Sequence, residues 1–234
     1  MQILSAKNVA ATLALTAAAG LAHAGTVKGN YDSAHSKTVN ITSPVNSGDV
    51  RTVTFNWTRA DLSPISPGAD LTIPANFITY CIELNQNISS SGGDKTFTVL
   101  TPAAHGFTSS QTSLLLNLWS AYQPTVSSSD ESAAFQSAVW EIVYDTDLNL
   151  QTGSFKLNTS GAVRTTAQNW LNAISSPTFA SSGPSLSLAV LKSSTLQDQL
   201  TVIPGPVVPA PASAAIGLLG GAVLIGRRKR PSSR

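Results

Sequence analysis

The sequence predicts an α+β fold: a β-rich sandwich or barrel with a helical insertion, preceded by an N-terminal signal peptide and followed by a C-terminal sorting helix. Three patterns support this prediction: strand-like alternation on both sides of the middle, a helical period in the middle, and apolar segments at the two ends. The 234 residues are 42% hydrophobic and 11% charged, enough for one sizeable core. We therefore expect a signal peptide at 1–24, one domain at 25–203 and a sorting tail at 204–234.

The first segment has the features of a secretory leader. Lys7 precedes an apolar run, Val9 to Leu21, and Ala22-His23-Ala24 follows it. One charge, a short apolar region and an A-x-A site are typical of a signal peptide, with cleavage expected after Ala24. A buried N-terminal helix is the alternative, but the alanine-rich run and its small-residue exit argue against it.

The best strand signal runs from Arg51 to Thr58, where apolar and polar residues alternate. Val53, Phe55 and Trp57 share one face, and Thr52, Thr54 and Asn56 share the other, which predicts a half-buried strand. Shorter strand candidates are Val27 to Tyr31, Lys37 to Thr42, Phe77 to Leu84, Lys95 to Leu100, Leu186 to Leu191 and Gln199 to Ile203.

The helical signals lie between Thr108 and Ile174. Thr108-x-x-Gln111 and Ser128-x-x-Glu131 have capping-box spacing, which predicts two helix starts. Apolar residues then recur at helical spacing: Leu115, Leu118, Trp119 and Tyr122 in the first helix, and Phe135, Ala138, Val139 and Ile142 in the second. A third helix is expected from Val163 to Ile174, closed by Pro177.

The C-terminal tail has three parts in order: the motif Val208-Pro209-Ala210-Pro211, an apolar stretch from Ala212 to Ile225, and the basic cluster Arg227, Arg228, Lys229 and Arg230. Fourteen helical residues reach about 21 Å, short of the roughly 30 Å hydrocarbon core. Basic residues favour the cytoplasmic side, so we expect a transient inner-membrane anchor that is later removed.

This tail resembles the PEP-CTERM sorting domain, with Ala210 in place of the commoner Glu. The resemblance covers about the last 27 residues and implies an exosortase-type processing enzyme as a partner. It also implies a Gram-negative, biofilm- or exopolysaccharide-forming cell, with the protein displayed on its surface or in its extracellular matrix.

The charge of the chain argues against a nucleic-acid partner. Five of the fourteen basic residues lie in the last eight positions and Lys7 lies in the leader. Eight basic and all twelve acidic residues remain between them, a net charge of −4. A nucleic-acid-binding domain would instead carry a basic surface.

Cys81 is the only cysteine of a chain that is expected to be exported. It cannot form an internal disulfide, so it is buried, paired with another chain or used chemically. A small buried residue is the ordinary outcome for such a cysteine. Strand parity argues mildly against burial, because Cys81 shares a face with Thr79 and Glu83, opposite the apolar Ile78, Tyr80, Ile82 and Leu84.

Tyr80-Cys81-Ile82-Glu83 and Gln136-Ser-Ala-Val-Trp140 together resemble the paired motifs of the thioester domains of bacterial surface adhesins. The resemblance implies that Cys81 supplies the thiol and Gln136 the acyl group of an internal thioester. Tyr80 and Trp140 match the family's flanking aromatic positions. This chain has Phe135 before the glutamine, Val139 before the tryptophan and Glu83 where aspartate is usual.

The chemistry requires these residue types. A thiolate is a strong nucleophile, and a carboxamide that loses ammonia leaves an acyl group on sulfur, which an amine can then displace. Apolar surroundings must protect such a bond from water, and Tyr80 and Trp140 are the candidate shields. Gln136 and Trp140 are four residues apart and share one helix face. We expect an adhesin-like protein that attaches to amines on a target surface or matrix, without turnover as an enzyme and without catalytic residues, metal or cofactor.

Other interpretations remain. Gln136 alone would be an ordinary polar residue of an amphipathic helix, and the protein would then be a non-reactive exopolysaccharide- or biofilm-associated structural protein. A cysteine hydrolase that uses Cys81 and His105 is a weaker alternative, because no protease-like signature surrounds Cys81. Asp145-x-Asp147-x-Asn149 begins like a calcium loop, but Leu150 replaces the needed glycine and Lys156 the closing glutamate, so an acidic turn is expected.

Overall fold

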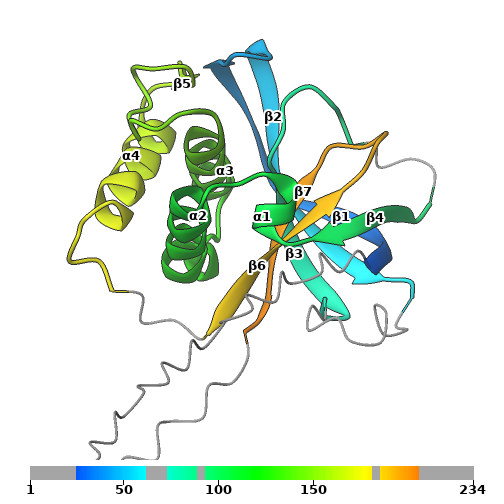
Figure 1. Cartoon of the computed structure of the whole chain (residues 1–234). Helices are drawn as coiled ribbons and strands as arrows, with labels where there is room; N and C mark the ends of the chain where they lie inside the picture. Colours follow the sequence, from blue (N-terminus) through cyan, green and yellow to red (C-terminus); the bar gives the residue numbers. More distant parts are fainter. Residues whose placement is uncertain (1–24, 62–72, 89–92, 181–184, 206–234) are drawn as a thin grey trace, which may run out of the picture.

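The computed structural model describes residues 25–61, 73–88, 93–180 and 185–205 (Figure 1). The strands are β1 (Gly25–Thr42), β2 (Ser47–Arg59), β3 (Asn76–Cys81), β4 (Lys95–Leu100), β5 (Lys156–Leu157), β6 (Leu186–Lys192) and β7 (Gln199–Pro204). The helices are α1 (Pro102–His105), α2 (Ser109–Tyr122), the 3₁₀ turn η1 (Gln123–Thr125), α3 (Ser129–Tyr144) and α4 (Ala162–Ile174). This is the predicted mixture of strands around a helical middle.

The sheet closes into an antiparallel barrel. Its order is β2-β3-β7-β6-β4-β1-β5, and β1 also pairs with β2, which joins the two sides. Closure occurs at Gly29, which pairs with Lys95 of β4 and with Arg59 of β2. A Cβ atom at Gly29 would lie 2.8 Å from the backbone oxygen of Thr58, so a larger residue would force the strands apart at this corner. The barrel form of the prediction is therefore correct.

The helices all lie in one insertion of the chain, between β4 and β6; α2, α3 and α4 form a group on one side of the barrel, whereas short α1 lies against β6 (Figure 1). Helix α3 packs across β1, β2 and β3, while α2 and α4 pack against α3. Strand β5 returns from this insertion to pair with the end of β1, where Ile41 lies opposite Leu157. The insertion is thus fixed to the barrel at both α3 and β5.

The middle of strand β2, Thr52 to Phe55, is buried on both faces, which corrects the expectation of a half-buried strand there, whereas Asn56 on the predicted polar face is exposed as expected. Thr52 is 1% exposed and Thr54 4% exposed, like their apolar neighbours Val53 and Phe55 at 8% and 4%. Thr54 shares a hydrogen bond of 2.7 Å with Ser132 of α3, and its hydroxyl also donates to the Tyr80 hydroxyl. Helix α3 covers the face of the strand that the alternation assigned to solvent.

The predicted helix starts are present. Thr108 and Gln111 form a complete capping box at α2. Ser128 accepts a hydrogen bond from the Glu131 backbone at α3, but the Glu131 carboxylate reaches back to the Ser127 backbone, one residue before the expected partner. These contacts satisfy backbone N–H groups that have no partner inside the helix.

The core has two aromatic groups, one on each side of β3. Inside the barrel, the Trp57 ring contacts Phe77, Phe97 and Tyr31. Between barrel and helices, the Tyr80 ring contacts Trp119 and Phe135. Each fully buried large side chain contributes about 1.5–3 kcal/mol, so both groups stabilise the position of β3.

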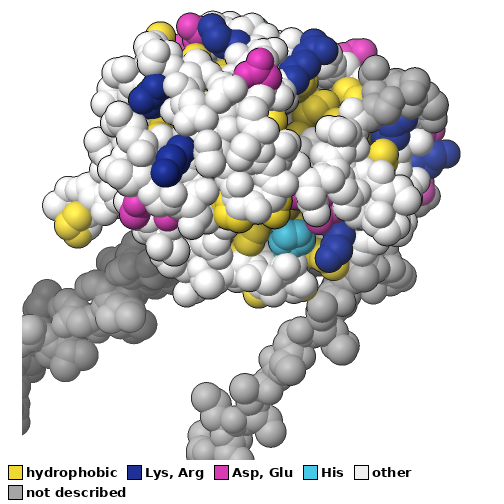
Figure 2. Space-filling model, turned by 90° about the horizontal axis from the view of Figure 1, so that it is seen from above, with side chains coloured by type: hydrophobic (Ala, Val, Ile, Leu, Met, Phe, Trp, Pro, Cys, Tyr) yellow, Lys and Arg dark blue, Asp and Glu magenta, His cyan; other side chains and the backbone are white. Residues whose placement is uncertain are grey.

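The face seen in Figure 2 is mostly uncharged, with basic and acidic side chains interspersed. Within the described residues, no helix is long and apolar enough to span a bilayer. The predicted signal peptide, the Val208–Pro211 motif and the basic residues Arg227 to Arg230 lie outside the described residues. The expected domain boundary at residue 203 falls one residue before the end of β7.

Candidate functional site

The last residue of β3, Cys81, places its side chain on the inner face of the barrel. Successive residues of a strand point to opposite faces, so Cys81 and Thr79 point inward and Tyr80 points toward the helices. Cys81 pairs with Gln199 of β7 and is 5% exposed. The parity argument assigned the correct face, but its conclusion that this face is less buried is wrong, because the face lines the barrel interior.

The thiol of Cys81 lies in a small polar group within the barrel. Its Sγ donates to Oε1 of Gln197 at 2.8 Å, and Nε2 of Gln199 donates to Sγ at 3.4 Å. Burial raises the pKa of the thiol to about 12, although the hydrogen bond from Gln199 acts in the opposite direction. The thiol is therefore protonated near neutral pH.

The same group extends into the barrel through Thr79. Its hydroxyl donates to Oε1 of Gln199 and accepts from the indole nitrogen of Trp57. Gln199 is thereby fixed at both ends of its carboxamide. The sequence analysis missed Gln197 and Gln199, because they follow Cys81 by more than a hundred residues and only the β3–β7 pairing brings them to it.

Helix α3 presents Gln136 to the backbone of Cys81. The Gln136 side chain is fully buried. Its Oε1 accepts from the Cys81 backbone N–H at 2.9 Å, and its Nε2 donates to the Cys81 backbone oxygen at 2.7 Å. The carboxamide thus binds both polar backbone atoms of the residue that carries the thiol.

The strand register leaves the backbone N–H and carbonyl of Cys81 without a partner in a neighbouring strand. The pairing of β2 with β3 ends where Phe55 lies opposite Thr79, so no residue of β2 pairs with Cys81. On the other side, Ile82 donates to the Asp198 backbone oxygen near β7. Adjacent residues of a strand direct their backbone groups to opposite sides, so those of Cys81 point into the gap beyond β2. Gln136 fills this gap and replaces the missing strand partner.

A cavity of about 320 Å³ lies beside the thiol. Cys81, Trp140, Gln197 and Phe55 line its inner part. Asn46, Asp49, Arg51, Gln86 and Asn87 give its wall a polar character. The cavity provides space for a hydrophilic group next to Cys81.

The two candidate shielding aromatics have different positions. Trp140 is 1% exposed, lines the cavity and contacts the Phe155 ring. Tyr80 is fully buried and does not line the cavity. Tyr80 lies on the opposite face of β3 from the Cys81 thiol, among Trp119 and Phe135, where burial raises the pKa of its hydroxyl to about 12.

The His105 side chain is paired with Asp198 and not with the Cys81 thiol. Its Nε2 lies 3.1 Å from Oδ2 of Asp198, and its ring contacts Phe107. The hydrogen-bond partners of the Cys81 thiol are glutamine side chains, so the described residues do not form the cysteine–histidine pair that the hydrolase alternative needs.

The sequence matches no protein-family model and no curated protein. Among solved structures, the chain is similar to the N-terminal domain of the Streptococcus pyogenes pilus tip adhesin Cpa. The sequence identity is 14% and the TM-score 0.43, over 80% of this chain and 97% of that chain. A similarity of this size does not show a shared function, so the functional argument depends on the geometry at Cys81 and Gln136.

Proposed function

We propose that the chain is an exported, adhesin-like surface protein that attaches covalently to amines through an internal thioester between Cys81 and Gln136. The observation that carries this proposal is the position of the Gln136 carboxamide. It is fully buried and held by two hydrogen bonds against the residue that bears the only thiol of the chain.

Bond formation requires no co-reactant. The Cys81 sulfur bonds to the side-chain carbonyl carbon of Gln136, the bond from that carbon to Nε2 breaks, and the amide group leaves with the thiol proton as ammonia. The backbone N–H of Cys81 donates to Oε1, which polarises the carbonyl and stabilises the negative charge that develops on its oxygen. Because the thiol is protonated near neutral pH, the reaction is slow, and because it consumes the Gln136 carboxamide it occurs once per chain.

In the attachment step the Cys81 sulfur, which was the nucleophile, becomes the leaving group. An incoming primary amine adds to the thioester carbonyl, the carbon–sulfur bond breaks, and Cys81 regains a proton as the Gln136 carbonyl becomes an amide of the target. Nε2 of Gln199 already donates to Sγ and stabilises the departing thiolate. The cavity beside Cys81 has polar walls that suit a hydrophilic amine, and Trp140 shields the bond from one side.

Location and partners rest on the two ends of the sequence. We propose that the signal peptide exports the chain and that the C-terminal segment holds it transiently at the inner membrane of a Gram-negative cell. An exosortase-type enzyme then removes the tail, and the domain reaches the surface or the extracellular matrix. The target is a protein or polysaccharide amine, and one attachment per chain is not turnover by an enzyme.

One observation favours a second candidate, a non-reactive structural protein of the surface or biofilm matrix. The carboxamide of Gln136 already satisfies both backbone groups of Cys81, and the thiol already donates to Gln197. Hydrogen bonding alone therefore explains the burial of both residues.

Mass spectrometry separates the two candidates. The thioester lowers the mass of the mature protein by one ammonia, and methylamine restores a free thiol while it adds to Gln136. The structural candidate predicts full sequence mass and no reaction with methylamine.

A further inference from the structure

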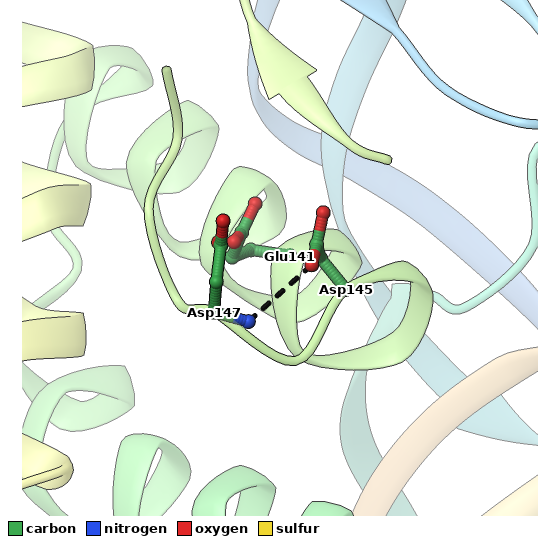
Figure 3. A group of neighbouring side chains, drawn as sticks. All are labelled: Glu141, Asp145 and Asp147. Atoms are coloured by element: carbon green, nitrogen blue, oxygen red, sulfur yellow. Dashed lines mark hydrogen bonds between the residues drawn. The ribbon is translucent and has the colours of Figure 1, made fainter. Parts of the chain in front are cut away.

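A second group of polar side chains lies at the C-terminal end of α3, away from the thiol. Carboxylate oxygens of Glu141, Asp145 and Asp147 all lie within 4.8 Å of one another. Figure 3 shows the three side chains gathered around the end of the helix, with the backbone N–H of Asp147 donating to Asp145. Glu141 is buried, Asp145 half-buried and Asp147 exposed, so the group opens to solvent on one side.

The burial of Glu141 is poorly compensated. Its side chain is fully buried, and neither carboxylate oxygen accepts a hydrogen bond of standard geometry from the described residues; the backbone N–H of Asn149 lies near enough to lower its pKa slightly. Buried carboxylates are normally paired or bind a metal, because removal from water strongly disfavours their charge. An unpartnered buried carboxylate that lies against two others is a favourable position for a positively charged ligand.

The surroundings favour a cation. The last turn of α3 contains no basic residue, although the C-terminal end of a helix attracts positive charge. No ion pair between described residues involves the three carboxylates. Burial, followed by the charges of Asp145 and Asp147, raises the pKa of Glu141 to about 8.

Asp145 and Asp147 are held in place by the loop that follows the helix. Asp145 accepts hydrogen bonds from the backbone of Thr146, Asp147, Ser154 and Phe155. Burial alone would raise the pKa of Asp145, but these backbone hydrogen bonds lower it, so it stays ionised. Asp147 accepts from the Asn149 backbone and from the Thr152 hydroxyl. Each carboxylate oxygen has two lone pairs, so Asp147 retains one on each oxygen, whereas a cation at Asp145 would have to displace one of its four backbone hydrogen bonds.

We propose that Glu141, Asp145 and Asp147 bind a Ca²⁺ ion that joins the end of α3 to the loop at 145–155. Calcium binds carboxylate oxygens at about 2.3–2.6 Å, so two ligands of one ion are at most about 5 Å apart, which fits the separation in this group. Mg²⁺ requires shorter distances of about 2.0–2.1 Å and a near-ideal octahedron, so titration with each ion separates the two.

The calcium-loop comparison in the sequence failed because it required the closing carboxylate downstream, where Lys156 stands. The fold supplies a carboxylate from upstream instead. Glu141 precedes Asp145 by four residues, one helical turn, and therefore points to the same end of α3. The inference does not depend on the thioester.

The test is calcium titration of the purified protein after treatment with EGTA. We expect a dissociation constant of about 10⁻⁴–10⁻³ M, as in extracellular calcium modules. At ten times that concentration, Ca²⁺ is expected to raise the melting temperature by about 3–6 °C. Glu141→Gln and Asp147→Asn should each abolish the shift. Asp130→Asn, which removes an acidic group from the first turn of the same helix, should leave it intact.

Calorimetry gives an independent readout. Titration of the wild-type protein with CaCl₂ should saturate at about one ion per chain, and the heat of binding should disappear in Glu141→Gln. Three results would overturn the proposal: no calcium response in the wild-type protein, a response that survives Glu141→Gln, or an equal response to Mg²⁺.

Discussion

The Gln136 side chain completes the hydrogen bonding of the Cys81 backbone from a different element of the fold. Two hydrogen bonds of 2.7 and 2.9 Å connect α3 to the end of β3, where β2 no longer pairs with it. The geometry gives Gln136 a structural role whether or not it reacts. This dual role makes experiments at Gln136 informative, because stability and chemistry respond differently to substitution.

Gln136→Ala is expected to destabilise the fold. The substitution leaves the N–H and the carbonyl of Cys81 buried without partners, each at about 1–3 kcal/mol. We expect the free energy of unfolding to fall by about 2–5 kcal/mol, measured by urea denaturation. Gln151→Ala, at an exposed glutamine of the loop after α3, serves as a control and should change it little. A loss below 0.5 kcal/mol at Gln136 would show that the two hydrogen bonds do not support β3.

Gln136→Glu tests the same contact through pH. A carboxylate can accept from the Cys81 N–H but repels the Cys81 carbonyl, whereas a protonated carboxyl can donate to it. The pKa of the new group is therefore raised in the folded state, and its contribution to stability is present at low pH and lost as pH rises. We expect this variant to be closer to the wild-type stability at pH 5 than at pH 8. If the difference in stability between the variant and the wild type is the same at pH 5 and pH 8, the hydrogen bonds assigned to the Gln136 carboxamide are wrong.

The free thiol should react slowly even when no thioester forms. Burial raises the pKa of Cys81 from 9.0 to about 12, a thousandfold decrease in the thiolate fraction at neutral pH. In Gln136→Glu, which keeps the side chain's size, iodoacetamide is expected to modify Cys81 about a thousandfold more slowly in the native protein than in urea. Rapid native labelling would mean that the thiol is exposed. Resistance to thiol reagents therefore does not by itself demonstrate a thioester.

Glu141 gives the protein a defined pH dependence. Its pKa of about 8 in the folded state lies above the ordinary value of 4.5, so it contributes stability below pH 4.5 that is lost as pH rises toward 8. With EGTA present, the free energy of unfolding of the wild-type protein should fall between pH 5 and pH 8.5. This fall should exceed that of Glu141→Gln by on the order of a few kcal/mol. Parallel profiles for the two proteins would disprove the buried charge.

Local patterns predicted most elements of the fold because the underlying signals are local. Thr108 with Gln111, and Ser128 with Glu131, indicated the starts of α2 and α3 from residues three positions apart. The burial of Thr52 and Thr54 was not predicted, because it depends on α3, which packs on β2 from more than 70 residues away.

In the candidate site, too, some contacts could be predicted from the sequence and others depend on the fold. Cys81 and Gln136 were paired through their resemblance to a known family, and the structure places them in contact. Gln197 and Gln199 reach the thiol only through the pairing of β7 with β3, and Glu141 meets Asp145 and Asp147 only because α3 ends between them. The linear sequence gives no sign of the first arrangement and only part of the second, the spacing of Asp145-x-Asp147-x-Asn149.

The mass of the mature protein tests the central claim most directly. Denatured in mild acid, which preserves a thioester, the wild-type protein should weigh one ammonia less than its processed sequence, and this deficit should vanish in Cys81→Ala and in Gln136→Glu. Treatment of the native wild type with methylamine should add one methylamine at Gln136 and give a Cys81 thiol that can be labelled after denaturation. A wild-type protein of full sequence mass that takes up no methylamine would contradict the thioester and favour the structural matrix protein.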